Sequence, residues 1–196
     1  MALEPPAPWR ERKRRHILEA ASRVFAERDY HSVSMDQVAR RARVGKGTLY
    51  RYFDSKEDLY LALLDSALLL LTDRLEQEEK AGLPPDQTLS RMVSAIVSTF
   101  GQHLPSFRVL NGNEARLVVR KRQLFQSRRR HLVMLLGRVL ERGVTAGIFR
   151  AVDPVATPSL LIGMVWGAVL NHSEESPPEV LARTIVDVFF RGTLKP

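Results

Sequence analysis

Cysteine is absent from all 196 positions of the sequence. Its absence excludes disulfide bonds as a source of stability and thiolate chemistry as a source of catalysis. The N-terminal residues, "MALEPPAPWRERKRR", contain no apolar segment of the kind that a secretory signal needs. We therefore expect a protein that remains in the cytoplasm.

Long apolar runs are also missing. The longest uncharged stretch, residues 155–173, is interrupted by polar residues and proline, whereas a membrane span needs roughly 20 apolar residues. This stretch predicts a buried helix instead. No window alternates apolar and polar residues between turn signals, which is the pattern of a half-buried strand. The sequence therefore predicts an all-α fold.

Signatures of catalysis are missing as well. There is no glycine-rich phosphate loop, no nucleophile elbow and no HExxH motif. The histidines do not have the spacing of metal ligands; they are His16, His31, His103, His131 and His172. We expect no enzymatic activity, no bound metal and no cofactor.

The charge balance is strongly basic and uneven. The net charge is +8 and the pI is about 10.3, which suggests a polyanionic partner, either nucleic acid or an acidic membrane surface. Residues 1–56 carry 13 basic and 7 acidic side chains, against 17 and 15 in the remainder. Most of the excess therefore lies in the first quarter of the chain, which favours a dedicated basic module there.

Capping signals divide the first part of the chain into short helices. Ser34 with Gln37 three residues later forms a capping box, and Ser55 begins a further helix with Asp58 at the same spacing. Together with the apolar periodicity, these signals predict four helices in this part of the chain. They cover residues 9–28, about two turns that begin at Ser34, residues 46–52, and the stretch from Ser55 to residue 79.

Further helices are expected in the second part, which brings the total to about nine. Their predicted positions are 86–101, 104–110, 113–142, Asp153 to 172, and Ser176 to 191. The chain would then consist of an N-terminal domain, residues 1–56, and a C-terminal helical domain, residues 57–196.

The three N-terminal helices predict a helix-turn-helix, because a short turn joins the second to the third. The third helix would lie in a DNA major groove. Leu49 and Phe53 would point inward. The side chains that would face DNA begin that helix or offer donors to phosphates: Lys46, Gly47, Thr48, Tyr50, Arg51 and Tyr52. Gly47 would leave room for the backbone to approach the duplex.

Other cations extend this surface. Lys56 lies in the first turn of a helix, where a cation is unfavourable unless an anion such as a phosphate binds there. Arg43 and the basic run at 10–16 are further candidates for phosphate contacts. The alternative for each of them is a solvated surface charge without a role.

The segment "ILEAASRVFAERDYHSVSMDQVARRARVGKGTLYRYFDSKEDLYLALL", residues 17–64, resembles the DNA-binding domain of the tetracycline repressor (TetR) family. The resemblance implies a homodimeric regulator of transcription, usually a repressor that acts on a palindromic operator. It also implies a C-terminal domain that dimerises and binds a small ligand. By the same resemblance, Thr48 and Tyr50 would contact bases or nearby phosphates, Lys46 would lie at a base-reading position, and Ser34, Tyr52 and Lys56 would bind phosphates.

The C-terminal half offers two weaker patterns. An apolar cavity is expected among its helices, with a lining of Phe107, Phe125, Met134 and Trp166. The resemblance implies that the last two helices pair with their twins in a dimer through Leu161, Val165, Val169, Ile185, Val188 and Phe189. Ordinary core packing within one subunit is the alternative for both sets.

The basic runs "RKR" at 120–122 and "RRR" at 128–130 could receive an anionic ligand such as an acyl-coenzyme A. A solvated helix face is the competing explanation. The sequence thus favours a repressor released from DNA by a hydrophobic or anionic effector. The alternatives are a constitutive or architectural DNA-binding protein without an effector, and a basic helical enzyme or membrane-surface protein.

Overall fold

The computed structural model describes residues 9–28, 30–102, 115–171 and 177–193, without the side chains of residues 102, 115–125 and 170. The regular elements within these ranges are helices, as the sequence predicts. They are α1 (Trp9–Glu27), the 3₁₀ turn η1 (Tyr30–Ser32), α2 (Met35–Arg41), α3 (Lys46–Tyr52), α4 (Lys56–Lys80), α5 (Pro85–Gln102), α7 (Ala115–Thr145), α8 (Ala156–Asn171) and α9 (Pro178–Thr193). The helix expected at 104–110 lies outside the described residues.

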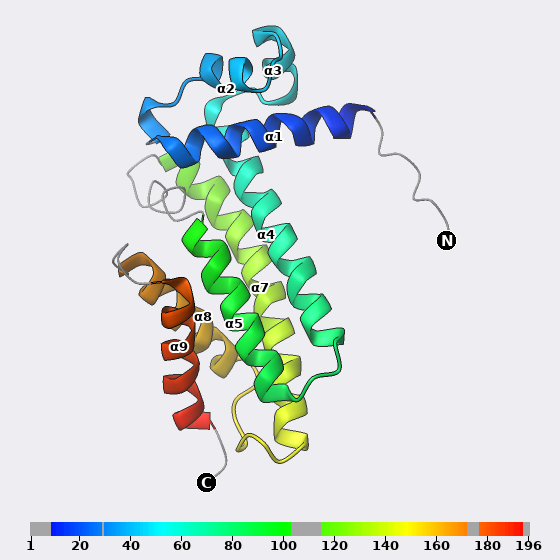
Figure 1. The fold of residues 1–196 in the computed structure, drawn as a ribbon, viewed down its shortest axis with the longest axis vertical. Helices are drawn as coiled ribbons and strands as arrows, with labels where there is room; N and C mark the ends of the chain where they lie inside the picture. Colours follow the sequence, from blue (N-terminus) through cyan, green and yellow to red (C-terminus); the bar gives the residue numbers. More distant parts are fainter. Residues whose placement is uncertain (1–8, 29, 103–114, 172–176, 194–196) are drawn as a thin grey trace.

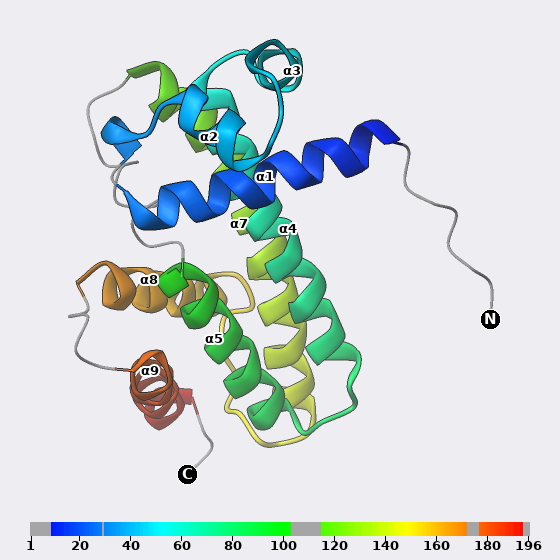
Figure 2. The ribbon, with the colours of Figure 1, turned by 45° about the horizontal axis from the view of Figure 1, so that its top comes forward.

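The helices form two regions (Figure 1). Helix α1 lies across one end of the long helices α4, α5 and α7, with α2 and α3 on its far side. Helices α8 and α9 flank α5 on the side opposite α4, and the turned view in Figure 2 shows the same arrangement. Helix α4 runs from the α2–α3 region along the whole length of the bundle, so it joins the two regions directly.

The predicted helix starts have simple physical causes. The Ser34 hydroxyl accepts the Gln37 N–H while the Gln37 side chain accepts the Ser34 N–H, so the predicted capping box is confirmed. Ser55 accepts the Asp58 N–H at 3.0 Å and caps α4. Asp153 accepts the N–H groups of Ala156 and Val155, which lower the pKa of its carboxyl. The regular part of α8 begins only at Ala156, because a turn follows Asp153.

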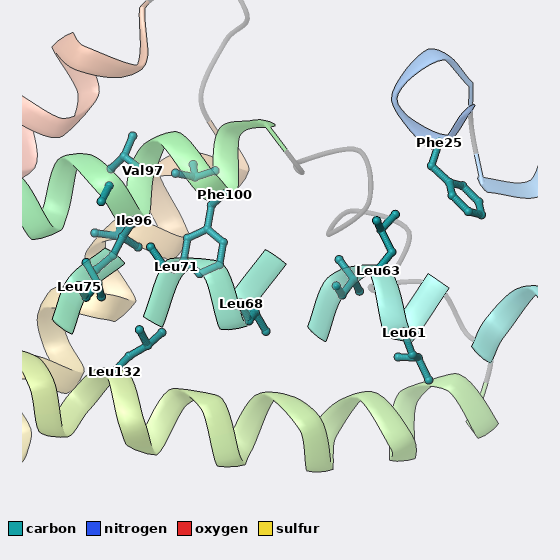
Figure 3. Close-up of a cluster of buried hydrophobic side chains, with 14 of the residues drawn as sticks. Phe25, Leu61, Leu63, Leu68, Leu71, Leu75, Ile96, Val97, Phe100 and Leu132 are labelled. Carbon is teal, nitrogen blue, oxygen red and sulfur yellow. The ribbon is translucent and has the colours of Figure 1, made fainter. Parts of the chain in front are cut away.

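One hydrophobic core runs through both regions. Figure 3 shows Phe100 of α5 pointing toward Leu68 and Leu71 of α4. At the other end of α4, the ring of Tyr60 lies 5.0 Å from that of Phe25 and 4.8 Å from that of Tyr30. The first turns of α4 therefore pack with the N-terminal helices and the rest with α5 and α7, so a movement of α4 would affect both regions. The domain boundary at residue 56 stays a prediction.

Close packing fixes the turn between α7 and α8. A Cβ atom at Gly143 would overlap the ring of Phe149, which is buried. The Arg150 guanidinium donates to the Gly192 carbonyl at 2.7 Å and so ties this turn to the end of α9. Among the described residues, no helix combines the length and the apolar character that a membrane crossing requires.

Candidate nucleic-acid interface and ligand cavity

Helix α3 presents one face to solvent and one to the core. Leu49 and Phe53, four residues apart, are buried. The opposite face is exposed and consists of Lys46, Gly47, Tyr50 and Arg51, with Thr48 half-buried at its edge. This division follows from the helical period, which brings positions separated by three or four onto the same side. The predicted recognition face therefore exists as a continuous exposed surface.

The turn before α3 has a Schellman geometry in which arginine takes the position that glycine usually occupies. The Val44 N–H bonds to the Ala39 carbonyl and the Arg43 N–H to the Arg40 carbonyl. Arg43 has a φ of 51°, in the left-handed region, which costs a non-glycine residue roughly 1 kcal/mol. Its side chain is exposed beside α3, where the sequence predicts a DNA contact.

Lys46 is held across the turn by Asp36 of α2. Its ammonium lies 2.9 Å from one oxygen of that carboxylate. The hydrogen bond and the charge of Asp36 raise the pKa of Lys46. Both side chains are exposed, so this pair contributes little to stability. It orients the first cation of the recognition face and leaves it open to solvent.

Lys56 has a different environment from that expected. Its ammonium donates to the carbonyls of Tyr30 at 2.9 Å, Val33 at 3.1 Å and His31 at 3.5 Å, and it lies 4.3 Å from the centre of the Tyr30 ring. These carbonyls belong to η1 and to Val33, the residue after it, and lie 23 to 26 positions earlier in the chain. A solvated surface charge, the alternative for Lys56, does not describe this arrangement. The contact of Lys56 with phosphate stays a prediction.

The two other residues predicted to contact phosphates are Ser34, just before α2, and Tyr52, the last residue of α3. Ser34 is exposed, and because its oxygen already accepts an N–H bond, its own proton remains available to a phosphate. Tyr52 is half-buried and packs against the core, and its hydroxyl has no hydrogen-bond partner among the described residues. The Arg51 guanidinium lies 5.9 Å from the centre of the Tyr52 ring.

The basic start of α1 also lies at this surface. Its side chains from Trp9 to His16 are exposed except for the half-buried Lys13. The Arg14 guanidinium lies 5.3 Å from the centre of the Phe53 ring, and the His16 ring bonds to the Ala42 carbonyl at 2.9 Å. These contacts place the basic segment beside the end of α3.

A cavity of about 410 Å³ lies among α4, α5, α7 and α8. That volume is typical of a small-molecule site. Its apolar lining is Leu68, Phe100, Leu132, Ile162, Gly163 and Trp166, and the rings of Phe100 and Trp166 meet edge to face at 5.3 Å. The polar lining is Gln126, Arg128 and Arg129. A groove of about 510 Å³ adjoins the cavity, shares Gln126 and Arg129 with it, and adds Arg130.

The predicted cavity residues have mixed outcomes. Trp166 lines the cavity. Met134 is 49% exposed and does not line the cavity wall that the described residues form. Phe107 and the side chain of Phe125 lie outside the described residues. Sequence reasoning missed Leu68 and Phe100, because periodicity marks them as core without indicating that a void remains between their helices.

Most of the residues predicted for the dimer interface are covered within one chain. Five of the six are buried inside the single chain, where α8 and α9 pack against α5 and against each other: Leu161, Val165, Val169, Ile185 and Phe189. Val188 is 55% exposed and remains available to a partner. Apolar periodicity shows that a helix face is covered but not which neighbour covers it, so a dimer contact of these residues stays a prediction.

The described part of the chain contains no group of three or more histidine, aspartate and glutamate side chains that could hold a metal ion. The basic face around α3 and the arginine-bordered cavity are two surfaces that could bind a partner, in addition to the exposed apolar side chains of α8 and α9.

Family models match most of the chain. Residues 17–63 match the model of bacterial regulatory proteins of the tetR family, and residues 82–193 match the tetracyclin repressor-like C-terminal domain. The curated relative YhgD of Bacillus subtilis, described as an uncharacterized HTH-type transcriptional regulator, is 24% identical over 85% of this chain and 87% of its own length.

Two further curated relatives match about half of each chain. The transcriptional activator FasR of Mycolicibacterium smegmatis is 34% identical over 54% of this chain and 48% of its own length. The fatty acid metabolism regulator protein of Bacillus subtilis is 32% identical over 44% of this chain and 45% of its own length.

Solved structures share the fold. A TetR-family regulator from Mesorhizobium loti superposes with a TM-score of 0.77 at 20% identity, covering 96% of this chain and 100% of its own. FadR of Bacillus subtilis, solved with stearoyl-CoA, gives 0.74 at 22% identity over 91% and 98%. AibR, solved with isovaleryl coenzyme A and operator DNA, gives 0.66 at 22% identity over 90% and 97%.

The two family matches fit the structure, which has an exposed basic face on α3 and a cavity in the helical half. The chain belongs to the tetR family of bacterial regulatory proteins and is a helix-turn-helix regulator of transcription that binds DNA.

Proposed function

We propose that this protein is a cytoplasmic homodimeric repressor whose binding to a palindromic operator is relieved by a long-chain acyl-coenzyme A. The observation that carries the proposal is the joining of an apolar cavity to an arginine-lined groove. An acyl chain would occupy the cavity, and the coenzyme A phosphates would meet Arg128, Arg129 and Arg130. Arginine suits this role because its guanidinium matches phosphate geometry.

The relatives support this ligand class. The structures of FadR and AibR are complexes with stearoyl-CoA and isovaleryl coenzyme A, and one curated relative is a fatty acid metabolism regulator. A constitutive DNA-binding protein would have no use for a cavity of this size between the helices that carry its DNA-binding region. In the proposed release, the ligand shifts the equilibrium between a DNA-binding conformer and a released conformer. Moving the ratio of released to DNA-binding conformer from 1:99 to 99:1 requires that the ligand bind the released conformer more favourably by about 5.5 kcal/mol.

Palmitoyl-CoA is the first test ligand. Calorimetry should show binding, and fluorescence anisotropy with an operator recovered from genomic fragments should show at least a tenfold loss of DNA affinity when the ligand is saturating. Octanoyl-CoA and coenzyme A alone serve as controls for chain length. Binding without any change in DNA affinity would contradict the proposal. A promoter-reporter assay measures whether the protein represses or activates its target gene. This test is needed because the relative FasR is an activator.

The dimer would form through the exposed face of α8 and α9. Leu160 is 67% exposed on α8, and it borders a groove with Met164 of the same helix and Val188 of α9. Apolar side chains of this kind on adjacent helices suit an interface between two copies, which bury the same patch on each. A two-fold dimer would also place two copies of α3 in successive major grooves of a palindrome.

Leu160→Glu is expected to convert the dimer to a monomer, because two carboxylates would meet near the symmetry axis without partners. Sedimentation equilibrium measures the mass, and operator affinity should fall together with it. Leu70→Glu is the matched control, since Leu70 is 68% exposed on α4 and does not line the groove of α8 and α9. The proposed interface is wrong if both variants, or neither, remain dimeric.

A further inference from the structure

Arg128 lies at the contact between the cavity and the helix that carries the DNA-binding region. Its guanidinium donates two hydrogen bonds to Asp65 of α4, from Nε at 2.9 Å and from Nη2 at 2.7 Å. The two side chains are about equally shielded, with 29% and 33% of their surfaces exposed. Arg128 also lines the cavity, as does Leu68, which lies on α4 three residues after Asp65.

This ion pair holds α4 to α7 nearer the start of α4 than the other ion pairs between these two helices do. Further along, Arg138 binds Glu79 through two hydrogen bonds of 2.7 Å, and Arg142 donates to the carbonyls of Glu79 and Leu83 at 3.1 Å. Those contacts fix the C-terminal end of α4. The Arg128–Asp65 pair lies nearer the DNA-binding region, and Lys56, nine residues before Asp65, clamps the start of the same helix to η1.

The geometry of the pair leaves it open to competition. Both hydrogen bonds converge on the same oxygen, Oδ1 of Asp65, so the arginine fork does not use two acceptors. A phosphate or carboxylate that offers two oxygens satisfies the fork better. An anionic group entering along the cavity wall would therefore compete with Asp65 for the guanidinium.

From this arrangement we propose that Arg128 has two alternative partners, Asp65 in the DNA-binding conformer and the anionic group of the ligand in the released conformer. The inference rests on the proposed function for the ligand class. When Arg128 turns to the ligand, Asp65 loses its partner, and α4 is freed at residue 65 while the contacts at Glu79 and Leu83 hold its far end. The start of α4, and with it α2 and α3, then changes position.

The two partners predict opposite effects on ligand affinity. Asp65→Asn removes the competing charge, so palmitoyl-CoA should bind about tenfold more tightly. Arg128→Gln removes the group that binds the ligand, so palmitoyl-CoA should bind at least tenfold more weakly and should no longer release DNA. Without ligand, both variants should bind operator three- to tenfold more weakly, because each lacks the pair that holds the DNA-binding conformer.

Calorimetry with the full-length protein and anisotropy with operator DNA measure both quantities. Glu79→Gln is the control for ligand affinity, because it removes an ion pair between the same two helices outside the cavity lining and should leave ligand affinity unchanged. Free palmitate in place of palmitoyl-CoA shows whether a carboxylate alone engages Arg128.

The outcomes separate the two proposals. If palmitoyl-CoA and palmitate bind neither the parent nor the Asp65→Asn variant, the proposed function fails. If the parent binds and releases DNA but Asp65→Asn and Arg128→Gln change ligand affinity in the same direction, the pair is only structural and the inference is overturned. The inference is also overturned if the ligand-free Asp65→Asn variant melts at the same temperature as the parent and binds operator with the same affinity.

Discussion

Replacing Lys56 by methionine is expected to destabilise the protein by about 2 kcal/mol, which is the size of a few lost hydrogen bonds to a charged donor. Methionine keeps the length and the apolar stem but leaves the carbonyls of Tyr30, His31 and Val33 without the ammonium. The cation–π contact with the Tyr30 ring is lost as well. For a chain of this size, the melting temperature should fall by roughly 4–8 °C.

Lys46→Met is the matched control for this loss. Lys46 pairs with an exposed carboxylate, so its removal should cost less than about 0.5 kcal/mol. The salt dependence of DNA binding distinguishes the two lysines further. Loss of a phosphate contact lowers the log–log slope by about 0.9. We expect that decrease for Lys46→Met, and a smaller one for Lys56→Met, because the three donors of the Lys56 ammonium already have acceptors.

Two results would change this interpretation of Lys56. A melting temperature equal to that of the parent would show that the carbonyl contacts contribute nothing to stability. A full decrease in slope for Lys56→Met would show that the ammonium reaches a phosphate when DNA binds, as the family resemblance implies.

Local rules predicted much of the fold, because they act over a few residues. Ser34 and Gln37 are three positions apart, and the box that they form follows from their side chains alone. The exposed face of α3 follows from the helical period in the same way. The sequence predicts that α8 begins directly after its cap Asp153, two residues before the observed start at Ala156, because a capping signal does not distinguish a turn from a first helical turn.

Contacts between distant residues could not be predicted in this way. The acceptors of Lys56 lie 23 to 26 positions earlier, and Asp65 and Arg128 are 63 positions apart. Nothing in either segment indicates its partner until α4 and α7 are packed together. The same limit applies to the residues predicted for the dimer: Leu161 and Val165 have the apolar period of an interface, but they are buried within the same chain, where α8 packs against α5, α7 and α9.

Gly47→Ala is expected to affect folding and DNA binding in opposite directions. Gly47 is the second residue of α3, and a Cβ atom built there meets no atom of the described residues packed around it within 4 Å. Neither packing nor backbone conformation within the chain therefore requires glycine. Alanine favours the helix by up to about 1 kcal/mol over glycine, so the melting temperature should rise by up to roughly 2–4 °C.

DNA affinity should fall with the same substitution, because the open space beside Gly47 is where the backbone of α3 would approach the duplex. A methyl group there should weaken operator binding by roughly ten- to a hundredfold, the size of one lost base contact. Gly101→Ala in α5 is the control: its Cβ also meets no described atom within 4 Å, and it lies in the helical half. It should leave DNA affinity unchanged. If Gly47→Ala binds operator as tightly as the parent, α3 does not enter the groove with this face, and the assignment of Lys46 and Tyr50 to the DNA would have to be abandoned.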